Sequence, residues 1–243
     1  MADQKIVYET DTAYGHYQVV DGPYDGRQAR VLYSGIRQAA QSGLALDGKP
    51  DLLFDYNQRF LELVRGLEPD AMLVIGGGAC TLPRAVMLEF PGITVDVVEL
   101  DADLIHIARK FFDFQPTVKS RVLVGDGRQF IASTKQRYDL IILDAFVQTD
   151  IPQTFRTVDA IRDFYACLSP KGVLAINIIA VYNGIRSAPL HTLAADLRSC
   201  FEQVSLTPAD SRDSLWIAQN FVVTAEKTMV NASDFMRNRP LDI

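Results

Sequence analysis

Residues that could bind a nucleoside stand at the ends of three apolar runs of the sequence. The first run leads into Gly76-Gly77-Gly78, where glycines let the backbone approach a ligand and the next helix offers unpaired N–H groups. The second ends at Glu99, 21 residues after Gly78, where a carboxylate can accept hydrogen bonds from both ribose hydroxyls. The third ends at Asp126, between two glycines, where an acid can accept from an adenine amino group.

Two of these acids also have a structural interpretation. Glu99 could cap the helix that follows it, although Asp101 is better placed for that role. Asp126 could cap the short helix after its turn, and this is compatible with binding adenine. A glycine turn by itself is a weak indication, so the nucleoside interpretation depends on the order and spacing of all three segments.

A fourth acid, Asp144, ends the next apolar run and suits proton transfer. It should lie at the mouth of the cleft, where the reacting group of the ligand would be. An amine with a lysine-like pKa of ~10.4 must lose a proton before it attacks carbon, which costs about 4–5 kcal/mol at pH 7. A positioned carboxylate can accept that proton, so Asp144 is the candidate general base.

A nicotinamide dinucleotide fits the same glycine turn less well. The third glycine of the GxGxxG pattern is replaced by Thr81, and the Asp126 turn is not part of that pattern. A nicotinamide dinucleotide is therefore a disfavoured ligand.

These strand ends need a parallel sheet to bring them together. From Ala71 onward, apolar runs at 72–76, 93–100, 121–126, 138–144 and 172–179 alternate with helical patterns, which is typical of a doubly wound α/β sheet covered on both faces. Two further strands are expected at 201–206 and 214–223, as an antiparallel C-terminal hairpin.

The N-terminal part has a different pattern. Residues 5–35 alternate Tyr and Val with polar residues and turn signals, which predicts a small antiparallel β unit. A helix over 52–67 should then lead into the main domain. We therefore expect a small β unit and connector at 1–50 and a Rossmann-like nucleoside-binding transferase domain at 51–243.

Composition narrows the choice of partners and location. The formal net charge is −6 and no Lys/Arg run is present, so a nucleic acid is an unlikely partner. The longest apolar stretch, 172–181, is half of the ~20 residues that cross a bilayer, and residues 1–5 lack signal-peptide character. The three cysteines are far apart, which indicates neither disulfides nor a metal site. We expect a cytoplasmic protein with no membrane partner.

The motifs together resemble the polyamine aminopropyltransferases, the spermidine synthase family, which share the class I methyltransferase fold. Residues 32–38, LYSGIRQ, look like the family's LDGxxQ segment, and residues 54–58, FDYNQ, are similar to its FxYHE helix. The glycine turn, the VELD segment at 98–101 and the GDG turn at 125–127 follow in family order and spacing.

The resemblance implies a transferase in polyamine biosynthesis, with a homodimer formed partly through the N-terminal β unit. It implies that decarboxylated or intact S-adenosylmethionine is the co-substrate, and that Asp144, the first acid of the family's DxxD loop, is the proton acceptor. The residues to which nucleoside binding is assigned are Gln38, Tyr56, Gly76, Gly77, Gly78, Glu99, Leu100, Asp126 and Gly127.

Departures from the family pattern concern the amine substrate. Ala79 stands where the family has an acid that holds the aminopropyl amine, and Val147 replaces the second acid of DxxD. The tyrosine of the family's PTYPSG loop is missing from 207–211, although Trp216 fits the strand expected after it. These departures are similar to those of a divergent bacterial spermidine synthase-like branch, in which a GGGAxTLPR turn is familiar.

Losing two acids weakens the case for a putrescine-like diamine. Truncating one partner of a desolvated charge pair typically costs 2–5 kcal/mol, so two losses predict a fall in diamine affinity of roughly a thousandfold or more. Asp150, Asp210 or Asp213 could compensate from nearby loops, or could be ordinary surface acids.

Three hypotheses follow. The leading one is a spermidine synthase-like transferase that moves an aminopropyl-type group to an amine, with Asp144 as base. The second is an S-adenosylmethionine-dependent small-molecule methyltransferase, which Ala79 favours because an acid there would repel the methionine carboxylate. The third is a non-catalytic nucleoside-binding protein, suggested by the missing acids.

Overall fold

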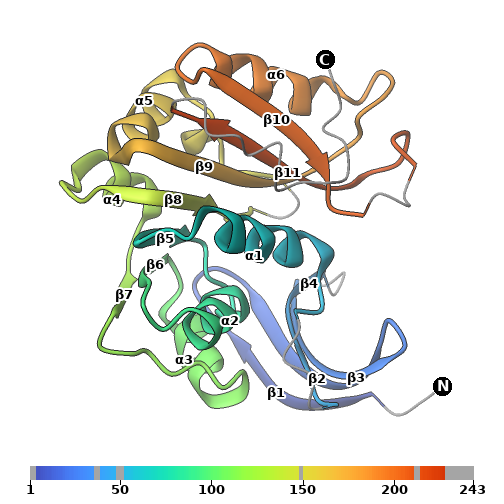
Figure 1. Cartoon of the computed structure of the whole chain (residues 1–243). Helices are drawn as coiled ribbons and strands as arrows, with labels where there is room; N and C mark the ends of the chain where they lie inside the picture. The colour runs from blue at the N-terminus through green and yellow to red at the C-terminus, as the bar shows by residue number, and fades with distance from the viewer. Residues whose placement is uncertain (1–3, 36–38, 48–51, 148–149, 211–213, 228–243) are drawn as a thin grey trace.

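The protein contains two β-sheets, one from the N-terminal part and one from the rest of the chain (Figure 1). The computed structural model describes residues 4–35, 39–47, 52–147, 150–210 and 214–227. Two residues named above, Gln38 and Asp213, lie outside these ranges.

The main sheet has seven strands in the order β10-β11-β9-β8-β5-β6-β7. Five of them run parallel, and β11 and β10 form an antiparallel hairpin at one edge. This confirms the doubly wound α/β sheet with a C-terminal hairpin that the sequence predicts. The strands span β5 Ala71–Ile75, β6 Thr94–Glu99, β7 Ser120–Val124, β8 Tyr138–Leu143, β9 Leu168–Ala180, β10 Gln203–Pro208 and β11 Gln219–Glu226.

Alternate residues of the central strands pack into two separate hydrophobic cores, one on each face of the sheet. In β5, Met72 and Val74 pack on the face that carries α1, α2 and α3, and Leu73 and Ile75 pack on the face that carries α4, α5 and α6. Burial on both faces explains why the strands are continuous apolar runs. The helices span α1 Asp55–Leu67, α2 Thr81–Glu89, α3 Ala102–Phe111, α4 Gly127–Ser133, α5 Val158–Cys167 and α6 Ala188–Arg198, with a short 3₁₀ helix at Gln153–Phe155.

The order of strands reverses beside β5. The chain leaves β5 toward β6 on one side, and β8 pairs with β5 on the other. Ligands of open α/β sheets bind at such a switch point, outside the carboxyl ends of the strands. Gly76 and Asp144, which follow β5 and β8, therefore face the same crevice.

The N-terminal sheet has four antiparallel strands in chain order, β1 Lys5–Asp11, β2 His16–Tyr24, β3 Arg27–Ser34 and β4 Ala39–Ala45. The small β unit expected at 5–35 is confirmed, and β4 extends it. The sequence of β4, AAQSGLA, lacks the β-branched and aromatic residues that mark a strand, which is why it was not predicted.

This sheet is packed against the main domain. Tyr17, Val19 and Leu32 belong to the same core as α1, α2 and α3. The guanidinium of Arg30 donates to the carbonyl of Phe111 at 2.9 Å, next to the end of α3. In Figure 1 the N-terminal sheet lies to the right of α2 and α3, in the lower part of the molecule, and the C-terminal hairpin lies at the top.

Several element boundaries differ from the prediction, including those of α1 and β11. The helix expected from 52 begins at Asp55, after Leu52 has paired with Leu44 of β4. The strand expected from 214 begins at Gln219, because residues 214–218 form a turn. Trp216 belongs to that turn and not to a strand, and its side chain is 66% exposed and lies near Gly184.

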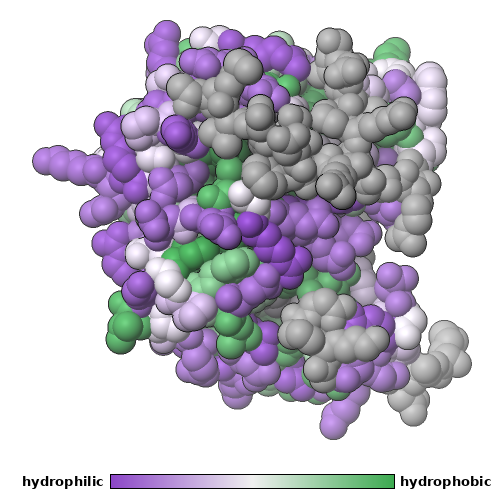
Figure 2. Space-filling view, in the orientation of Figure 1, coloured by the Kyte–Doolittle hydropathy of each residue, from purple (hydrophilic) through white to green (hydrophobic). Residues whose placement is uncertain are grey.

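Among the residues that the structure describes, no helix is both long enough and apolar enough to cross a bilayer. The face shown in Figure 2 is largely hydrophilic, and its apolar residues form small patches between polar side chains.

Candidate active site

A cavity of about 1180 Å³ lies at the carboxyl ends of β5, β6 and β8. Residues from β2, β4 and the start of α1 form its other walls. Apart from Gln38, every residue assigned to the site from the sequence lines this cavity, namely Tyr56, Gly76, Gly77, Gly78, Glu99, Leu100, Asp126, Gly127 and Asp144.

The glycine turn requires glycine for two reasons. Gly76 and Gly78 have positive φ angles of 82° and 51°, which L side chains rarely adopt. A Cβ at Gly76 would also overlap the carbonyl of Asp144, and one at Gly78 would lie 2.9 Å from the Ser42 hydroxyl. The turn is therefore enclosed by β4 on one side and by the end of β8 on the other.

Glu99 supports this turn directly. Its Oε2 accepts from the backbone N–H groups of Gly77 and Gly78 at 2.8 and 3.0 Å, and its Oε1 accepts from that of Asp101 at 3.0 Å. The side chain is 6% exposed, and desolvation raises the pKa of its carboxyl. Glu99 thus lines the cavity and also fixes the shape of the turn. Its contact with ribose stays a prediction.

The other two acids of the nucleoside motifs cap helices. Asp101 accepts from the N–H of Asp103 at the start of α3, which confirms that it caps this helix. Asp126 accepts from the N–H groups of Arg128 and Gln129 at the start of α4. Because Asp126 also lines the cavity, the capping role leaves its expected contact with adenine possible.

Asp144 is held by two neutral donors. Asn177 of β9 donates its Nδ2 to Oδ1 of Asp144 at 2.8 Å, and the hydroxyl of Tyr56 donates to the same carboxylate. Burial raises the pKa of Asp144 to about 7, although the two donors act in the opposite direction. A carboxylate with a pKa near neutrality is well matched to accept a proton at physiological pH.

Asn177 is itself oriented by a residue that sequence reasoning missed. Asn220 of β11 donates its Nδ2 to Oδ1 of Asn177 at 2.9 Å, so the amide of Asn177 must direct its NH₂ group toward Asp144. Both asparagines line the cavity. The signal available in the sequence was a single polar residue inside the apolar run 172–179.

The ionisable side chains among the described residues that line the cavity include acids but no bases. Among the described residues that line it there is no Lys, Arg or His, whereas seven carry a carboxylate. These acids are Asp25, Asp55, Glu99, Asp101, Asp126, Asp144 and Asp210. Such a lining favours cations, and the sulfonium of an adenosylmethionine-type nucleoside and the ammonium of an amine substrate are both cations.

The residues considered as replacements for the missing acids differ in position. Asp150 accepts from Arg156 at 3.3 Å and does not line the cavity, whereas Asp210 does. Ala79 is fully buried in the core beside α2, and its N–H donates to Ser42 at 3.0 Å.

No cluster of three or more His, Cys, Asp or Glu residues arranged to hold a metal ion occurs within the described ranges. Cys80, beside the glycine turn, is fully buried in the core, and burial raises the pKa of its thiol.

Comparison with known proteins gives one family. The spermine/spermidine synthase domain matches residues 60–206. A polyamine aminopropyltransferase of Vibrio vulnificus is 38% identical over 113 residues, which cover 45% of this chain and 38% of that protein. A human eEF1A lysine and N-terminal methyltransferase is 28% identical over 170 residues, which cover 65% of this chain and 23% of that protein. The chain thus matches well under half the length of either relative.

A solved structure has the same fold over nearly the whole chain. It is a probable spermidine synthase from Corynebacterium glutamicum, with a TM-score of 0.77 and 22% identity, and the match covers 96% of this chain and 86% of that one. The family domain covers more than half of the 243 residues. The chain therefore belongs to the spermine/spermidine synthase family.

Proposed function

We propose that this protein transfers an aminopropyl group from decarboxylated S-adenosylmethionine to an amine. The observation that carries the proposal is the cavity lining, in which seven carboxylates and no basic side chain occur among the described residues. Decarboxylated S-adenosylmethionine carries a sulfonium and an ammonium but no carboxylate. Intact S-adenosylmethionine adds a carboxylate that would find no cationic side chain among the described residues of that lining.

Asp144 supports the chemistry of this transfer. The acceptor nitrogen loses a proton to the Asp144 carboxylate and attacks the carbon beside the sulfonium. A new N–C bond forms, the C–S bond breaks, and its electron pair stays on sulfur, which leaves methylthioadenosine. The pKa of about 7 at Asp144 makes it a better base for an amine than an ordinary aspartate would be.

The test is turnover with purified protein. We expect methylthioadenosine to be released from decarboxylated S-adenosylmethionine in the presence of a suitable amine, and Asp144→Asn to lower kcat by 10²–10⁴-fold, the usual contribution of a general base. Binding of methylthioadenosine should be retained in this variant. If no amine of a broad panel supports release, aminopropyl transfer is excluded.

A methyltransferase is the second candidate, because the human relative with 28% identity is named as one. This activity would release adenosylhomocysteine instead of methylthioadenosine. Calorimetry separates the two proposals, since a methyltransferase should bind intact S-adenosylmethionine at least as tightly as its decarboxylated form. The acidic lining predicts the reverse order.

The assembly that we infer for this function is a cytoplasmic homodimer formed partly through the N-terminal sheet, as the family resemblance implies. Sedimentation of the full chain tests it. A mass near twice 27.0 kDa supports the dimer, and 27.0 kDa at all concentrations contradicts it.

A further inference from the structure

We propose that the amine acceptor is a primary monoamine with an apolar substituent, rather than a diamine. This inference rests on the proposed aminopropyl transfer, because it takes the position of the reacting amine from Asp144. If the amine nitrogen lies at Asp144, its substituent must lie along the adjacent wall of the cavity, which contains Phe146, Val147 and Ile179.

That wall exposes large apolar side chains. Val147, three residues after Asp144, is 63% exposed, and Ile179 of β9 is 39% exposed, and both line the cavity together with Phe146. Most large apolar side chains of this fold are buried, and apolar surface inside a concave site is typical of a site that binds an apolar group.

The geometry of the sheet places Ile179 next to the groups that hold Asp144. Ile179 pairs with Asn220 across β9 and β11, and Asn177 lies two residues back on the same face of β9. Asn177 contacts Asp144. Ile179, two residues along β9, is therefore farther from the reacting nitrogen than Asn177 is. An alkyl chain that extends from this nitrogen would therefore meet Ile179.

Among the residues that the structure describes, the same wall offers few partners to a second ammonium. Asn177 already donates to Asp144 and accepts from Asn220, and the carboxylate of Asp150 pairs with Arg156 outside the cavity. A buried ammonium without a charged partner is strongly disfavoured, so the far end of the acceptor should be uncharged. Asp210 follows Ala209, whose N–H donates to Asn220, and it is the lining acid on this side that a diamine would have to reach.

A matched pair of amines tests the inference. n-Pentylamine and 1,5-diaminopentane differ only in the terminal ammonium. With decarboxylated S-adenosylmethionine and the full chain, we expect kcat/KM for pentylamine to exceed that for the diamine by at least tenfold. Equal values, or a preference for the diamine, would overturn the inference while leaving aminopropyl transfer in place.

Substitutions at Val147 test the position of the substituent. Val147→Asp should reverse the preference by at least tenfold, and Val147→Ala should weaken pentylamine without improving the diamine. Val118→Asp is the control, because Val118 is fully exposed and does not line the cavity. An unchanged preference in Val147→Asp would contradict the assignment.

Absence of any turnover would refute the proposed function, and the amine preference of the cavity is then tested by binding alone. In that case calorimetry with the methylthioadenosine complex decides, since pentylamine should still bind at least tenfold more tightly than the diamine. Tighter binding of the diamine overturns the inference.

Discussion

At the scale of single residues, burial of the Asp144 carboxyl lowers the free energy of unfolding when the group is ionised. Its pKa of about 7 in the folded protein is above its ordinary value of 3.8, because burial disfavours the charged carboxylate. The folded state therefore binds this proton more tightly than the unfolded state does. As pH rises from about 4 to about 7, this difference lowers the free energy of unfolding.

Asp144→Asn should remove this pH dependence. We expect the variant to gain ~2–3 kcal/mol of stability relative to the native protein between pH 5 and pH 8, as measured by urea unfolding at both values. Asp150→Asn is the control, because that carboxylate is exposed and lies outside the cavity. A difference that does not vary with pH would mean that Asp144 has an ordinary pKa.

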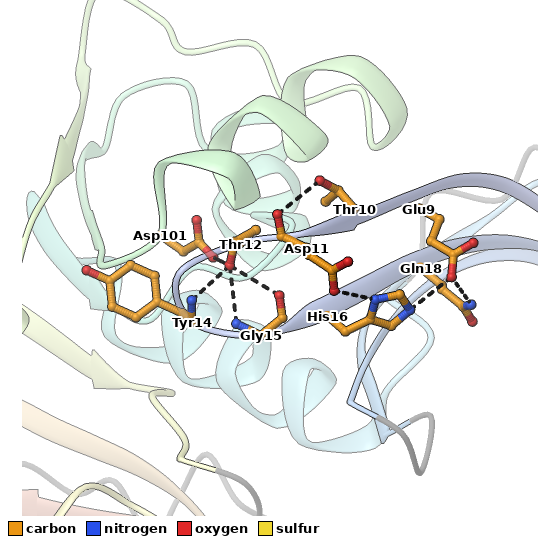
Figure 3. A network of polar contacts seen from close by, with 9 residues as sticks. All are labelled: Glu9, Thr10, Asp11, Thr12, Tyr14, Gly15, His16, Gln18 and Asp101. Atoms are coloured by element: carbon orange, nitrogen blue, oxygen red, sulfur yellow. Dashed lines mark hydrogen bonds and ion pairs between the residues drawn. The ribbon is translucent and has the colours of Figure 1, made fainter.

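A second residue-scale prediction concerns His16, which lies between two acids in the network of Figure 3. Its ring contacts Asp11 at 2.8 Å and Glu9 at 3.0 Å, and the hydrogen bond to Asp11 is the main cause of a raised pKa. The stabilising contribution is present below pH 6.5 and is lost as pH rises through the pKa of the folded protein.

NMR titration measures this directly. Asp11→Asn should lower the pKa of His16, and Glu9→Gln should lower it less. The assignment of Asp11 as main cause is wrong if Glu9→Gln has the larger effect.

At the scale of elements, the start of α4 shows how packing selects glycine. A Cβ at Gly127 would overlap the side chain of Ile75, whereas a Cβ at Gly125, two residues earlier, would meet nothing within 4 Å. We expect Gly127→Ala to destabilise by ~1–3 kcal/mol and Gly125→Ala to change stability by about 0.5 kcal/mol or less. Thermal unfolding of the two variants gives the comparison, and equal effects would contradict the packing argument.

The elements that could be predicted are those with a strong local signal. The strands of the parallel sheet are buried on both faces, so their apolar runs stand out in the sequence, and the acids at their ends lie where the topology requires. β4 gave no such signal, because its strand character comes from pairing with β3. Asn220 could not be assigned either, since its role depends on the register between β9 and β11.

At the scale of the whole molecule, one hydroxyl connects the two sheets next to the site. Thr12, in the turn between β1 and β2, donates its Oγ1 to Asp101 at 2.6 Å, and it accepts from the N–H groups of Tyr14 and Gly15 (Figure 3). Tyr14 and Gly15 line the cavity. Thr12 therefore positions part of the cavity wall over the acid that caps α3.

Thr12→Val should remove this connection. We expect a loss of ~1.5–3 kcal/mol in the free energy of unfolding, because the hydrogen bond is to a carboxylate, and faster hydrogen exchange in β1 and β2. Thr10→Val is the matched control, since the Thr10 hydroxyl makes only an exposed contact of 3.4 Å with a neighbouring carbonyl. Equal exchange in the two variants would show that the hydrogen bond from Thr12 to Asp101 does not hold the N-terminal sheet in place.

The contact between Gly76 and the backbone of Asp144 has a consequence for how this fold changes in evolution. The Asp144 N–H also donates to the carbonyl of Ile75 at 2.8 Å, so the glycine turn and Asp144, the proposed proton acceptor, are joined through main-chain atoms. The spacing between the glycine turn and residue 144 is thereby set by main-chain atoms. The proposed amine-binding wall consists of side chains such as Val147 and Ile179, so under the proposed function single substitutions there would change the acceptor while the main-chain link between the turn and residue 144 is kept.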